Sequence, residues 1–555
     1  MTEHWYDEAV IYCVDVDSFA DSDADGVGDF RGLIGRLGYL HRLGVSCLWL
    51  NPINPSPHRD DGYDISDFYA VDPALGSLGD FAELLHEASN VGIRVIIDLV
   101  VNHTSDQHPW FLSACGSPDS PYRDWYVWSD TEPPDRYEGI VFPGEQTETW
   151  TYHRSARAWY YHRFYDFQPD LNMANPAVRA EIRKIMGFWL QLGVAGFRMD
   201  AAPFVIEANQ AGEPSPPRDY EFLTQLRAHA SGRRGDALLL AEANVAPDEL
   251  PRYTGDSGGS GNRLHMLFDF VLNDAMVLGL ARRRAESIVS ALNNTPALPA
   301  GAQWATFLRN HDEIDLSRLT AEQRADVFEA FGPDEDMRLY GRGIRRRLAP
   351  MLDGDRRRLE LAYSLQFSLR GTPVLRYGEE IGMGDDLSLP GRESIRTPMQ
   401  WASTPNAGFS DAPAEALIRP VVAEGAFRYD AVNVAAQRRD PTSLLAWFER
   451  MISTLRETPE IGAGSCAPVE SDASGADLPP ALLTHRADGR TGSMLFLHNL
   501  DTEPVTVDLS HLYRAADHPS EAFGDRDYGP MGKMDEVQVA GYGYRWLRLC
   551  RNPAA

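Results

Sequence analysis

Eight short apolar, β-rich runs, each followed by a helical pattern, constrain the fold of this 555-residue chain more than any other feature. Alternation of strands and helices favours a parallel sheet, because each helix returns the chain to the start of the next strand by a right-handed crossover. Eight such units predict an α/β fold of the (β/α)8 TIM barrel type. The expected strands are Val10–Val16, Cys47–Leu50, Val95–Val101, Gly196–Met199, Leu238–Ala241, Met266–Phe270, Ala305–Leu308 and Val374–Tyr377.

The chain is longer than the roughly 250 residues of a barrel, so we expect further units. Residues 104–175 are rich in Trp, Tyr, Asp and Pro, with little helical periodicity, which indicates an inserted domain after the third strand. Short strands such as Ser493–Leu497 indicate a C-terminal antiparallel β-sandwich. The predicted units are barrel residues 1–103, an inserted B domain 104–175, the remaining barrel 176–460 with a decorated loop region at about 315–370, and a C-terminal domain 461–555.

The charge and the termini exclude several classes of partner. The formal net charge is −29, from 52 basic and 81 acidic residues, so the surface repels nucleic acid and anionic membranes. No window approaches the roughly 20 apolar residues of a membrane helix, and the acidic N-terminus does not resemble a signal peptide. The five cysteines lack metal or redox spacing, which favours free thiols. We therefore expect a cytoplasmic protein with no nucleic-acid or membrane partner.

Charged residues follow several of the predicted strands. Arg198 and Asp200 are two residues apart, so they point to the same side near a strand's C-terminal end, where a barrel's active site opens. Asp200 beside a fixed guanidinium would stay ionised, as a nucleophile must, although a structural ion pair is the alternative. Polar clusters at four strand ends together favour a catalytic site over isolated caps and turns. The other three clusters are DLVVNH (98–103), Glu242 in AEAN (241–244) and Asp312 in RNHD (309–312).

Converging acids are what glycoside chemistry requires. A retaining enzyme uses two carboxyl groups about 5–5.5 Å apart, of which one attacks the anomeric carbon. The other protonates the leaving oxygen, so its surroundings must raise its pKa. A third acid can hold sugar hydroxyls and stabilise the positively charged ring of the transition state.

These segments resemble the ordered motifs of glycoside hydrolase family thirteen, the α-amylase family. The resemblance covers roughly residues 4–460 and includes DLVVNH, GFRMD (196–200), the glutamate of AEAN, RNHD and FQPDLN (167–172). It implies that Asp200 is the nucleophile, Glu242 the general acid/base and Asp312 the transition-state stabiliser. It also implies sugar contacts by His103, Gln168, Arg198 and His311.

Two further segments resemble the exo-acting α-glucosidase and glucosyltransferase branch of that family, namely RDDGYD (59–64) and GRESIRTPMQW (391–401). By this resemblance, Asp60 and an arginine of the second segment would close the pocket behind the non-reducing glucose, and Tyr63 would stack on that ring. Arg392 and Arg396 are both candidates for the arginine. For RDDGYD taken alone, a polar turn is the alternative. A closed pocket would accept disaccharides and exclude cleavage inside a chain.

Three features resemble the trehalose synthase subfamily: EAN (242–244), LHMLFDFVLN (264–273) and YGRGIRRRLAPML (340–352). For the arginines at 345–347, a solvated helix face is the alternative. The resemblance implies interconversion of maltose and trehalose by a retaining double displacement, with minor hydrolysis. An exo-acting α-glucosidase, or an α-transglucosidase acting on another small α-glucoside, is the alternative activity. The expected partner is a disaccharide, and the sequence is compatible with a homo-oligomer and with a separate maltokinase.

Acids alternate around a glycine in DSDADGVGD (21–29). Oxygen ligands at this spacing can surround a hard cation, although the loop lacks the helix and the final glutamate of an EF-hand. A polar turn is the alternative. The family resemblance places calcium here, with Val27 offering its carbonyl oxygen. The candidate side-chain ligands are Asp21, Asp23, Asp25 and Asp29.

The resemblance also implies a second structural calcium site between the barrel and the inserted domain. Asn102 and Asp170 match positions where relatives bind calcium. Glu207 and the carbonyl oxygens of Phe204 and Val205 would join them, and a plain hydrogen-bonded cluster is the alternative. Mg²⁺ is the alternative ion at both sites, and no organic cofactor is expected.

Overall fold

The computed structural model describes residues 4–213, 216–255, 261–489, 492–513, 519–529 and 534–551. It contains eight strands that close a barrel: β1 Ile11–Val14, β2 Cys47–Leu50, β3 Arg94–Leu99, β7 Gly196–Met199, β8 Leu238–Ala241, β9 Met266–Phe268, β10 Gln303–Thr306 and β14 Thr372–Arg376. Their order around the barrel is β1-β14-β10-β9-β8-β7-β3-β2, and every neighbouring pair is parallel. The predicted (β/α)8 barrel is therefore confirmed.

One strand lies earlier in the chain than predicted. β10 ends at Thr306, whereas the sequence favoured a strand that continued to Leu308. The side chain of Asn273 donates its amide to the carbonyl oxygens of Phe307 and Leu308, at 2.7 and 3.2 Å. These two carbonyl groups therefore bond to a side chain instead of a neighbouring strand.

The barrel interior is filled by every second residue of its strands. The interior cluster includes Ile11, Trp49, Ile96, Leu240 and Val374, all almost inaccessible to solvent. Because strand side chains alternate with a period of two, the same inward rows continue toward the C-terminal ends of the strands. Two residues farther along these rows, the apolar side chains are replaced by charged ones: Asp98 after Ile96, Glu242 after Leu240 and Arg376 after Val374.

The helices around the barrel begin and end where their cap residues predict. In α4 (Pro176–Leu192), Asn175 accepts the N–H of Ala177, and proline occupies the first turn. The helix ends at Gly193, whose φ of +117° suits a residue without a side chain. The other long helices of the described barrel are α1 Phe30–Leu43, α2 Leu78–Asn90, α6 Tyr220–Arg233, α8 Phe270–Arg282, α9 Glu286–Asn294, α12 Arg356–Ser368 and α14 Leu444–Arg456.

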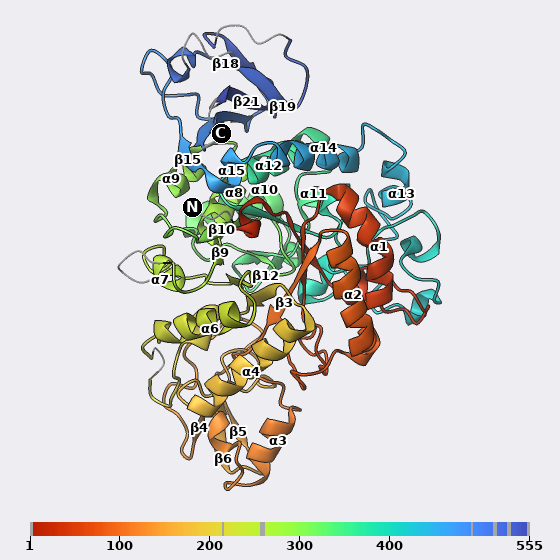
Figure 1. Ribbon diagram of the computed structural model, residues 1–555, viewed down its shortest axis with the longest axis vertical. Helices are drawn as coiled ribbons and strands as arrows, with labels where there is room; N and C mark the ends of the chain where they lie inside the picture. Colours follow the sequence, from red (N-terminus) through yellow and green to blue (C-terminus); the bar gives the residue numbers. More distant parts are fainter. Residues whose placement is uncertain are drawn as a thin grey trace.

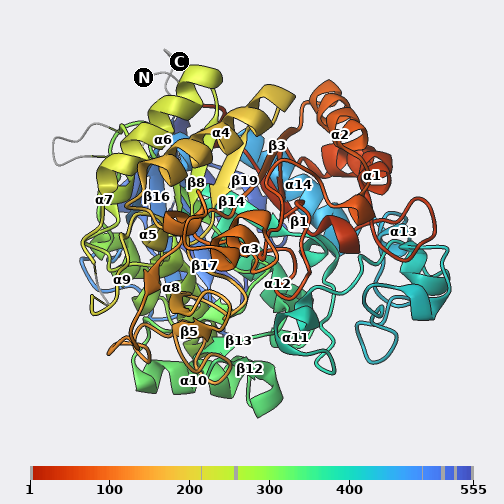
Figure 2. The ribbon, with the colours of Figure 1, turned by 90° about the horizontal axis from the view of Figure 1, so that it is seen from below.

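The segment between β3 and α4 forms a small separate unit. It contains α3 (Pro109–Gly116) and three short antiparallel strands in the order β4-β6-β5. The strands are β4 Trp128–Ser129, β5 Trp150–His153 and β6 Ala158–Tyr161. This unit lies at one end of the molecule in Figure 1, and Figure 2 looks onto it in front of the barrel. Because it leaves the barrel at the C-terminal end of β3, it lies where the charged rows end.

The C-terminal unit lies at the opposite end of the long axis (Figure 1). It has a five-stranded sheet in the order β15-β16-β17-β21-β19 and a two-stranded sheet β18-β20. An apolar cluster that includes Leu495, Val507, Val537 and Leu547 joins the two sheets. The strands are β15 Ser465–Pro468, β16 Leu482–Asp488, β17 Gly492–Asn499, β18 Val505–Val507, β19 Ser520–Gly524, β20 Val537–Val539 and β21 Tyr544–Arg551.

The long connection between β10 and β14 carries its own elements. A three-stranded sheet in the order β11-β13-β12 is followed by α11, and α10 lies between β11 and β12. The elements are β11 Ile314–Asp315, α10 Ala321–Phe331, β12 Arg338–Leu339, β13 Gly343–Ile344 and α11 Leu348–Met351. No helix in the described part of the chain has the length and apolar character that crossing a membrane requires.

The first prediction concerns Gly196, which begins β7 with a φ of +153°. A Cβ atom at this position would lie 2.2 Å from the carbonyl oxygen of Leu238, so Gly196→Ala must push two barrel strands apart. We expect the free energy of unfolding, measured by urea denaturation, to fall by about 1–3 kcal/mol. Gly35→Ala is the control, because a Cβ on this helical residue meets no atom within 4 Å. It should stabilise the protein by roughly 0.5–1 kcal/mol; equal effects of both changes would contradict the packing argument.

Candidate active site

A cavity of about 440 Å³ opens at the C-terminal ends of the barrel strands. Its wall includes Asp200, Glu242 and Asp312, which follow β7, β8 and β10. The inserted unit contributes Phe142 and Phe164 to the same wall. Of the residues that the sequence predicted for substrate, the cavity is lined by Asp60, Tyr63, His103, His311 and Arg392.

The guanidinium of Arg198 joins three carboxylates beneath the cavity. Its Nη1 donates to Asp200 Oδ1 at 2.7 Å and to Asp98 Oδ1 at 3.2 Å, and its Nη2 donates to Glu242 Oε2 at 2.7 Å. Arg198 is 1% exposed and Asp200 is 8% exposed, so water screens these interactions little. Asp200 and Glu242 are therefore held by two nitrogen atoms of one planar group, with both carboxylates at the cavity wall.

Three carboxylates share one guanidinium, so the cluster carries excess negative charge. Burial raises the pKa of Asp200 well above its usual value, and the carboxylates of Glu242 and Asp98 act in the same direction against Arg198. Burial likewise raises the pKa of Asp98 to about 6. This direction differs from the expectation that Arg198 keeps Asp200 ionised, because burial and two neighbouring carboxylates act against a single guanidinium.

The backbone behind Asp200 takes part in the same arrangement. Ala201 adopts the left-handed conformation, with φ of +47°. In this conformation, its N–H donates to Glu242 Oε2 at 3.2 Å. The sharp turn after Asp200 therefore helps to orient the side chain of the predicted acid/base.

Asp312 is surrounded by cations, in contrast to Asp200. Its Oδ1 lies 2.9 Å from Arg392 Nη1 and 3.2 Å from Arg396 Nη2, and its Oδ2 lies 3.2 Å from His311 Nε2. Despite burial, Arg392 and the other nearby cationic groups hold the pKa of Asp312 well below its usual range. Asp312 therefore stays ionised, which suits a group that stabilises developing positive charge on a sugar ring.

The two candidate arginines occupy different places. Arg392 lines the cavity with Asp60 and pairs with Asp312 and Glu313. Arg396 lies behind the wall, where it contacts Asp312 and pairs with Asp61. Arg392 is thus the arginine that faces the cavity, and Arg396 positions two acids from behind.

The predicted polar segment at 59–64 forms the far wall of the cavity. Gln168, fully buried, donates to Asp60 Oδ2 at 2.8 Å. Burial raises the pKa of Asp60 to about 6. Tyr63 Oη donates to Asp98 Oδ2 at 2.7 Å and lies 2.7 Å from His311 Nε2, and the Tyr63 and His311 rings are stacked.

His103 is the remaining predicted sugar-binding residue. Its Nε2 lies 3.1 Å from the carbonyl oxygen of Tyr63, and burial lowers its pKa to about 4. The imidazole is therefore neutral near pH 7. A neutral ring keeps one N–H as a donor without adding charge to the site.

The arginines at 345–347 are not a solvated helix face. Arg345 and Arg347 are 8% and 0% exposed. The Arg345 guanidinium donates to the carbonyl oxygens of Leu387, Leu389 and Gly391 at 2.6 to 3.0 Å. Arg345 therefore holds the loop that presents Arg392 to the cavity, whereas Arg347 donates to the carbonyl oxygen of Tyr377 and pairs with Glu379.

One side of the cavity is formed by contacts between the inserted unit and the loop around β12 and β13, from which Val141, Phe142 and Arg342 line it. The ring of Phe142 stacks between Tyr165 and Tyr340, with centroids 5.0 and 4.9 Å apart. Arg342 Nη2 donates to the carbonyl oxygen of Val141 at 2.9 Å. Two loops from distant parts of the chain thus meet at the cavity wall.

The predicted cation loop brings its acids together. One oxygen from each of Asp21, Asp23 and Asp29 lies within 4.8 Å of the others. Residual burial and the carboxylates of Asp25 and Asp29 raise the pKa of the exposed Asp23. Asp29 also caps α1 by accepting the N–H of Gly32 at 2.8 Å. The excess negative charge of this loop suits a hard cation.

The second predicted cluster is partly neutralised by arginine. Asp170 is fully buried, and its Oδ2 has no hydrogen-bond partner in the described part of the chain. Burial raises the pKa of Asp170 to about 7. Glu207, however, already pairs with Arg163 at 2.9 Å and Arg218 at 3.2 Å. Phe204 and Val205 lie in α5 (Ala202–Val205), directly before Glu207.

Several site residues were missed by the sequence reasoning. Asp98 was recognisable as an acid within an otherwise apolar strand, and Asp61 as the neighbour of Asp60. Phe142 carried no periodic or motif signal, and Tyr340 was named only as the first residue of the segment 340–352, because only the folded chain brings their loops together. The missed residues at or beside the cavity are Asp61, Asp98, Phe142, Asn244, Glu313, Tyr340 and Arg342.

The chain is similar to known proteins in both sequence and structure. The family described as "Alpha amylase, catalytic domain" matches residues 12–330 and 345–464. A trehalose synthase of Thermus thermophilus is 44% identical over 98% of this chain, which spans about half, 55%, of that relative. A trehalose synthase/amylase of Mycolicibacterium smegmatis is 41% identical over 98% of this chain and 93% of the relative. The crystal structure of trehalose-6-phosphate hydrolase from Bacillus licheniformis superposes with a TM-score of 0.78, at 25% identity, over 99% of this chain and all of that one.

The second prediction tests the shared guanidinium. Arg198→Lys keeps one positive charge but removes the planar fork that contacts Asp200 and Glu242 together. A lost charge-assisted hydrogen bond costs about 1.5–3 kcal/mol. We therefore expect kcat for p-nitrophenyl α-D-glucoside to fall roughly tenfold to hundredfold. Arg31→Lys is the control, because Arg31 forms a surface ion pair with Asp80. A variant at position 198 with unchanged turnover would show that the bridge is only structural.

Proposed function

This chain belongs to the α-amylase family, and we propose that it acts within that family as a trehalose synthase that interconverts maltose and trehalose. The relatives named trehalose synthase are 44% and 41% identical over 98% of the chain, which includes both loops that meet at the cavity wall. The substrate would be a neutral disaccharide, which suits a chain of net charge −29.

The acids divide the reaction into two displacements. Asp200 attacks the anomeric carbon of the non-reducing glucosyl unit while the bond to the leaving oxygen breaks. Glu242 gives its proton to that oxygen, so free glucose and a glucosyl ester of Asp200 result. In the second step, the anomeric hydroxyl of the released glucose attacks the same carbon, Glu242 accepts the hydroxyl proton, and Asp200 leaves. Two inversions retain the α configuration and produce the α,α-1,1 linkage of trehalose.

The observation that carries this proposal is the junction of two loops at the cavity wall. An isomerase must keep the released glucose in place while it turns, and must exclude water from the glucosyl ester. Stacking of Phe142 between Tyr165 and Tyr340 connects the inserted unit to the loop around β12 and β13. The bond from Arg342 to the backbone of Val141 closes the same junction.

Hydrolysis of maltose is the activity that competes with isomerisation at the same acids. If water reaches the glucosyl ester, Glu242 can activate it in place of the glucose hydroxyl, and maltose yields two glucose molecules. An oligo-1,6-glucosidase of Parageobacillus thermoglucosidasius is 32% identical over 82% of this chain, so hydrolytic relatives share much of the sequence. The product ratio therefore distinguishes the two functions.

The third prediction is that maltose is converted mainly to trehalose. Proton NMR of the protein incubated with maltose should show trehalose as the main product, with glucose as a minor one. Asp200→Asn should abolish both products while maltose still binds, as measured by calorimetry. Phe142→Ala should open the junction of the two loops and raise the fraction of glucose. Glucose as the main product of the unaltered protein would instead establish an α-glucosidase.

We further propose that the loop at 21–29 binds a structural Ca²⁺, with Mg²⁺ as the alternative ion. Asp21, Asp23, Asp25 and Asp29 are the candidate side-chain ligands, and Val27 would offer its carbonyl oxygen. A divalent ion would neutralise their mutual repulsion and stabilise the start of α1, which Asp29 caps. The ion would act on stability and not on the reaction, because the loop lies outside the residues that line the cavity.

A second ion at Asn102 and Asp170 is a weaker proposal. The unpartnered Oδ2 of Asp170 favours a bound cation or water. The arginine partners of Glu207 reduce the negative charge available to an ion. A homo-oligomer, a separate maltokinase partner and a cytoplasmic location remain predictions from the sequence.

The fourth prediction tests the loop at 21–29. Adding Ca²⁺ to protein treated with a chelator should raise the melting temperature, because an ion at a hundred times its Kd stabilises the folded state by about 2.7 kcal/mol. Asp23→Asn should weaken this response, whereas Asp119→Asn, at an exposed position outside the loop, should leave it unchanged. A calcium response that Asp23→Asn leaves intact would place the ion elsewhere.

A further inference from the structure

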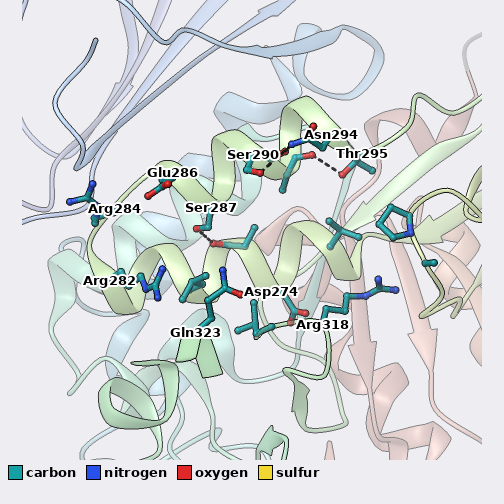
Figure 3. Close-up of a pocket in the computed structure, with 17 residues that line it drawn as sticks. Asp274, Arg282, Arg284, Glu286, Ser287, Ser290, Asn294, Thr295, Arg318 and Gln323 are labelled. Atoms are coloured by element: carbon teal, nitrogen blue, oxygen red, sulfur yellow. Dashed lines mark hydrogen bonds between the residues drawn. The ribbon is translucent and has the colours of Figure 1, made fainter. Parts of the chain in front are cut away.

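A second cavity, whose lining residues differ from those of the catalytic one, lies between α8 and α9. Its volume is about 580 Å³, and Figure 3 shows the two helices with the side chains that line it. α8 contributes Asp274 and Arg282, and α9 contributes Ser287 and Ser290. Arg318 and Gln323 complete the wall from the segment after β11. No residue of the proposed reaction lines this cavity.

Asp274 has one carboxyl oxygen, Oδ2, without a hydrogen-bond partner among the described residues. The residue is 4% exposed and lines the cavity. Burial raises the pKa of Asp274 well above its usual value, against the opposite effect of the neighbouring Arg318 and Arg324. Leaving a buried polar group unpaired costs about 1–3 kcal/mol, more when it is charged. A carboxyl group that serves only to fold the protein would be expected to have a donor. An unpaired one at a cavity wall is a group that a ligand can satisfy.

The surrounding side chains select the chemical class of that ligand. Arg282 is paired with Asp326 at 2.7 Å, and Arg318 donates to the neutral Asn244 Oδ1 at 2.7 Å. Arg284 and Glu286 also line the cavity (Figure 3). The wall thus mixes basic and acidic side chains, so an anion or a cation would meet groups of its own sign as well as of the opposite sign. A neutral ligand with several hydroxyl groups avoids both conflicts, because each hydroxyl can donate to a carboxylate and accept from an amide or guanidinium.

We propose that the cavity between α8 and α9 is a second saccharide-binding site, in which Asp274 accepts hydrogen bonds from sugar hydroxyls. Its volume falls within the range of pockets that hold small organic ligands. Ser290 and Gln323 supply further polar groups along the wall. The ligand is a neutral mono- or disaccharide, bound without chemistry.

The second site shares a wall with the catalytic cavity. Arg318, which lines the second site, donates to Asn244, and Asn244 lines the catalytic cavity two residues after Glu242. Asn244 in turn donates to Asp315 Oδ2 at 2.9 Å, and Asp315 also lines the catalytic cavity. The two sites are thus separate cavities joined by one layer of hydrogen-bonded side chains.

Hydrogen exchange followed by mass spectrometry tests the location directly. The Asp200→Asn protein removes turnover, so trehalose stays intact while amide exchange is measured over residues 270–294. We expect trehalose to slow exchange in α8 and α9, in addition to any slowing in segments that line the catalytic cavity. Binding at the second site and activity at the first are measured independently, so failure of one does not decide the other.

Matched variants distinguish trehalose binding in this cavity from a general effect of substitution on hydrogen exchange. In the same background, Ser290→Trp should fill the cavity and weaken the trehalose response of α8 and α9 at least tenfold, whereas Ser89→Trp, on the exposed face of α2, should not. Asp274→Asn should weaken the response about tenfold without lowering the melting temperature. The proposal is overturned if trehalose leaves exchange in α8 and α9 unchanged, if Ser290→Trp leaves the response intact, or if inorganic phosphate slows exchange there and trehalose does not.

Discussion

One buried guanidinium organises the catalytic centre. Arg198 contacts carboxylates that follow or end three adjacent strands, β3, β7 and β8, and it is almost completely hidden from water. Burial of an uncompensated charge costs several kcal/mol, so each carboxylate depends on this cation and the cation depends on them. The arrangement requires β7 to lie between β3 and β8, which is its place in the closed barrel. The chemistry is therefore supported by the whole barrel and not by one motif.

The electrostatic environments of the acids differ because their neighbours differ. Asp200 competes with two other carboxylates for one cation, whereas Asp312 lies against Arg392 and Arg396. The first environment favours retention of a proton in the cluster, and the second favours a permanent negative charge. An ionised Asp312 suits the role proposed for it, the stabilisation of a positively charged sugar ring.

In the proposed reaction, the loops around the cavity determine which molecule accepts the glucosyl group. Arg345 holds the segment that presents Arg392, and Phe142 joins the inserted unit to the loop at Tyr340. In the proposed reaction, the extent to which these loops exclude water would decide between hydrolysis and isomerisation, because water would compete with the released glucose for one reactive ester.

The barrel could be predicted from the sequence, because eight apolar strands alternate with helices, and charged residues at the strand ends predicted which acids would line the cavity, while their catalytic roles came from the family resemblance. The choice between Arg392 and Arg396, the burial of the arginines at 345–347 and the early end of β10 could not be predicted. Each depends on partners far away in the chain: Asp312 and Asp61, the carbonyl groups at 387–391, and the amide of Asn273. Sequence periodicity determined which residues face inward, and tertiary packing alone decided which of them meet, since hydrogen-bond partners distant in sequence leave no local pattern.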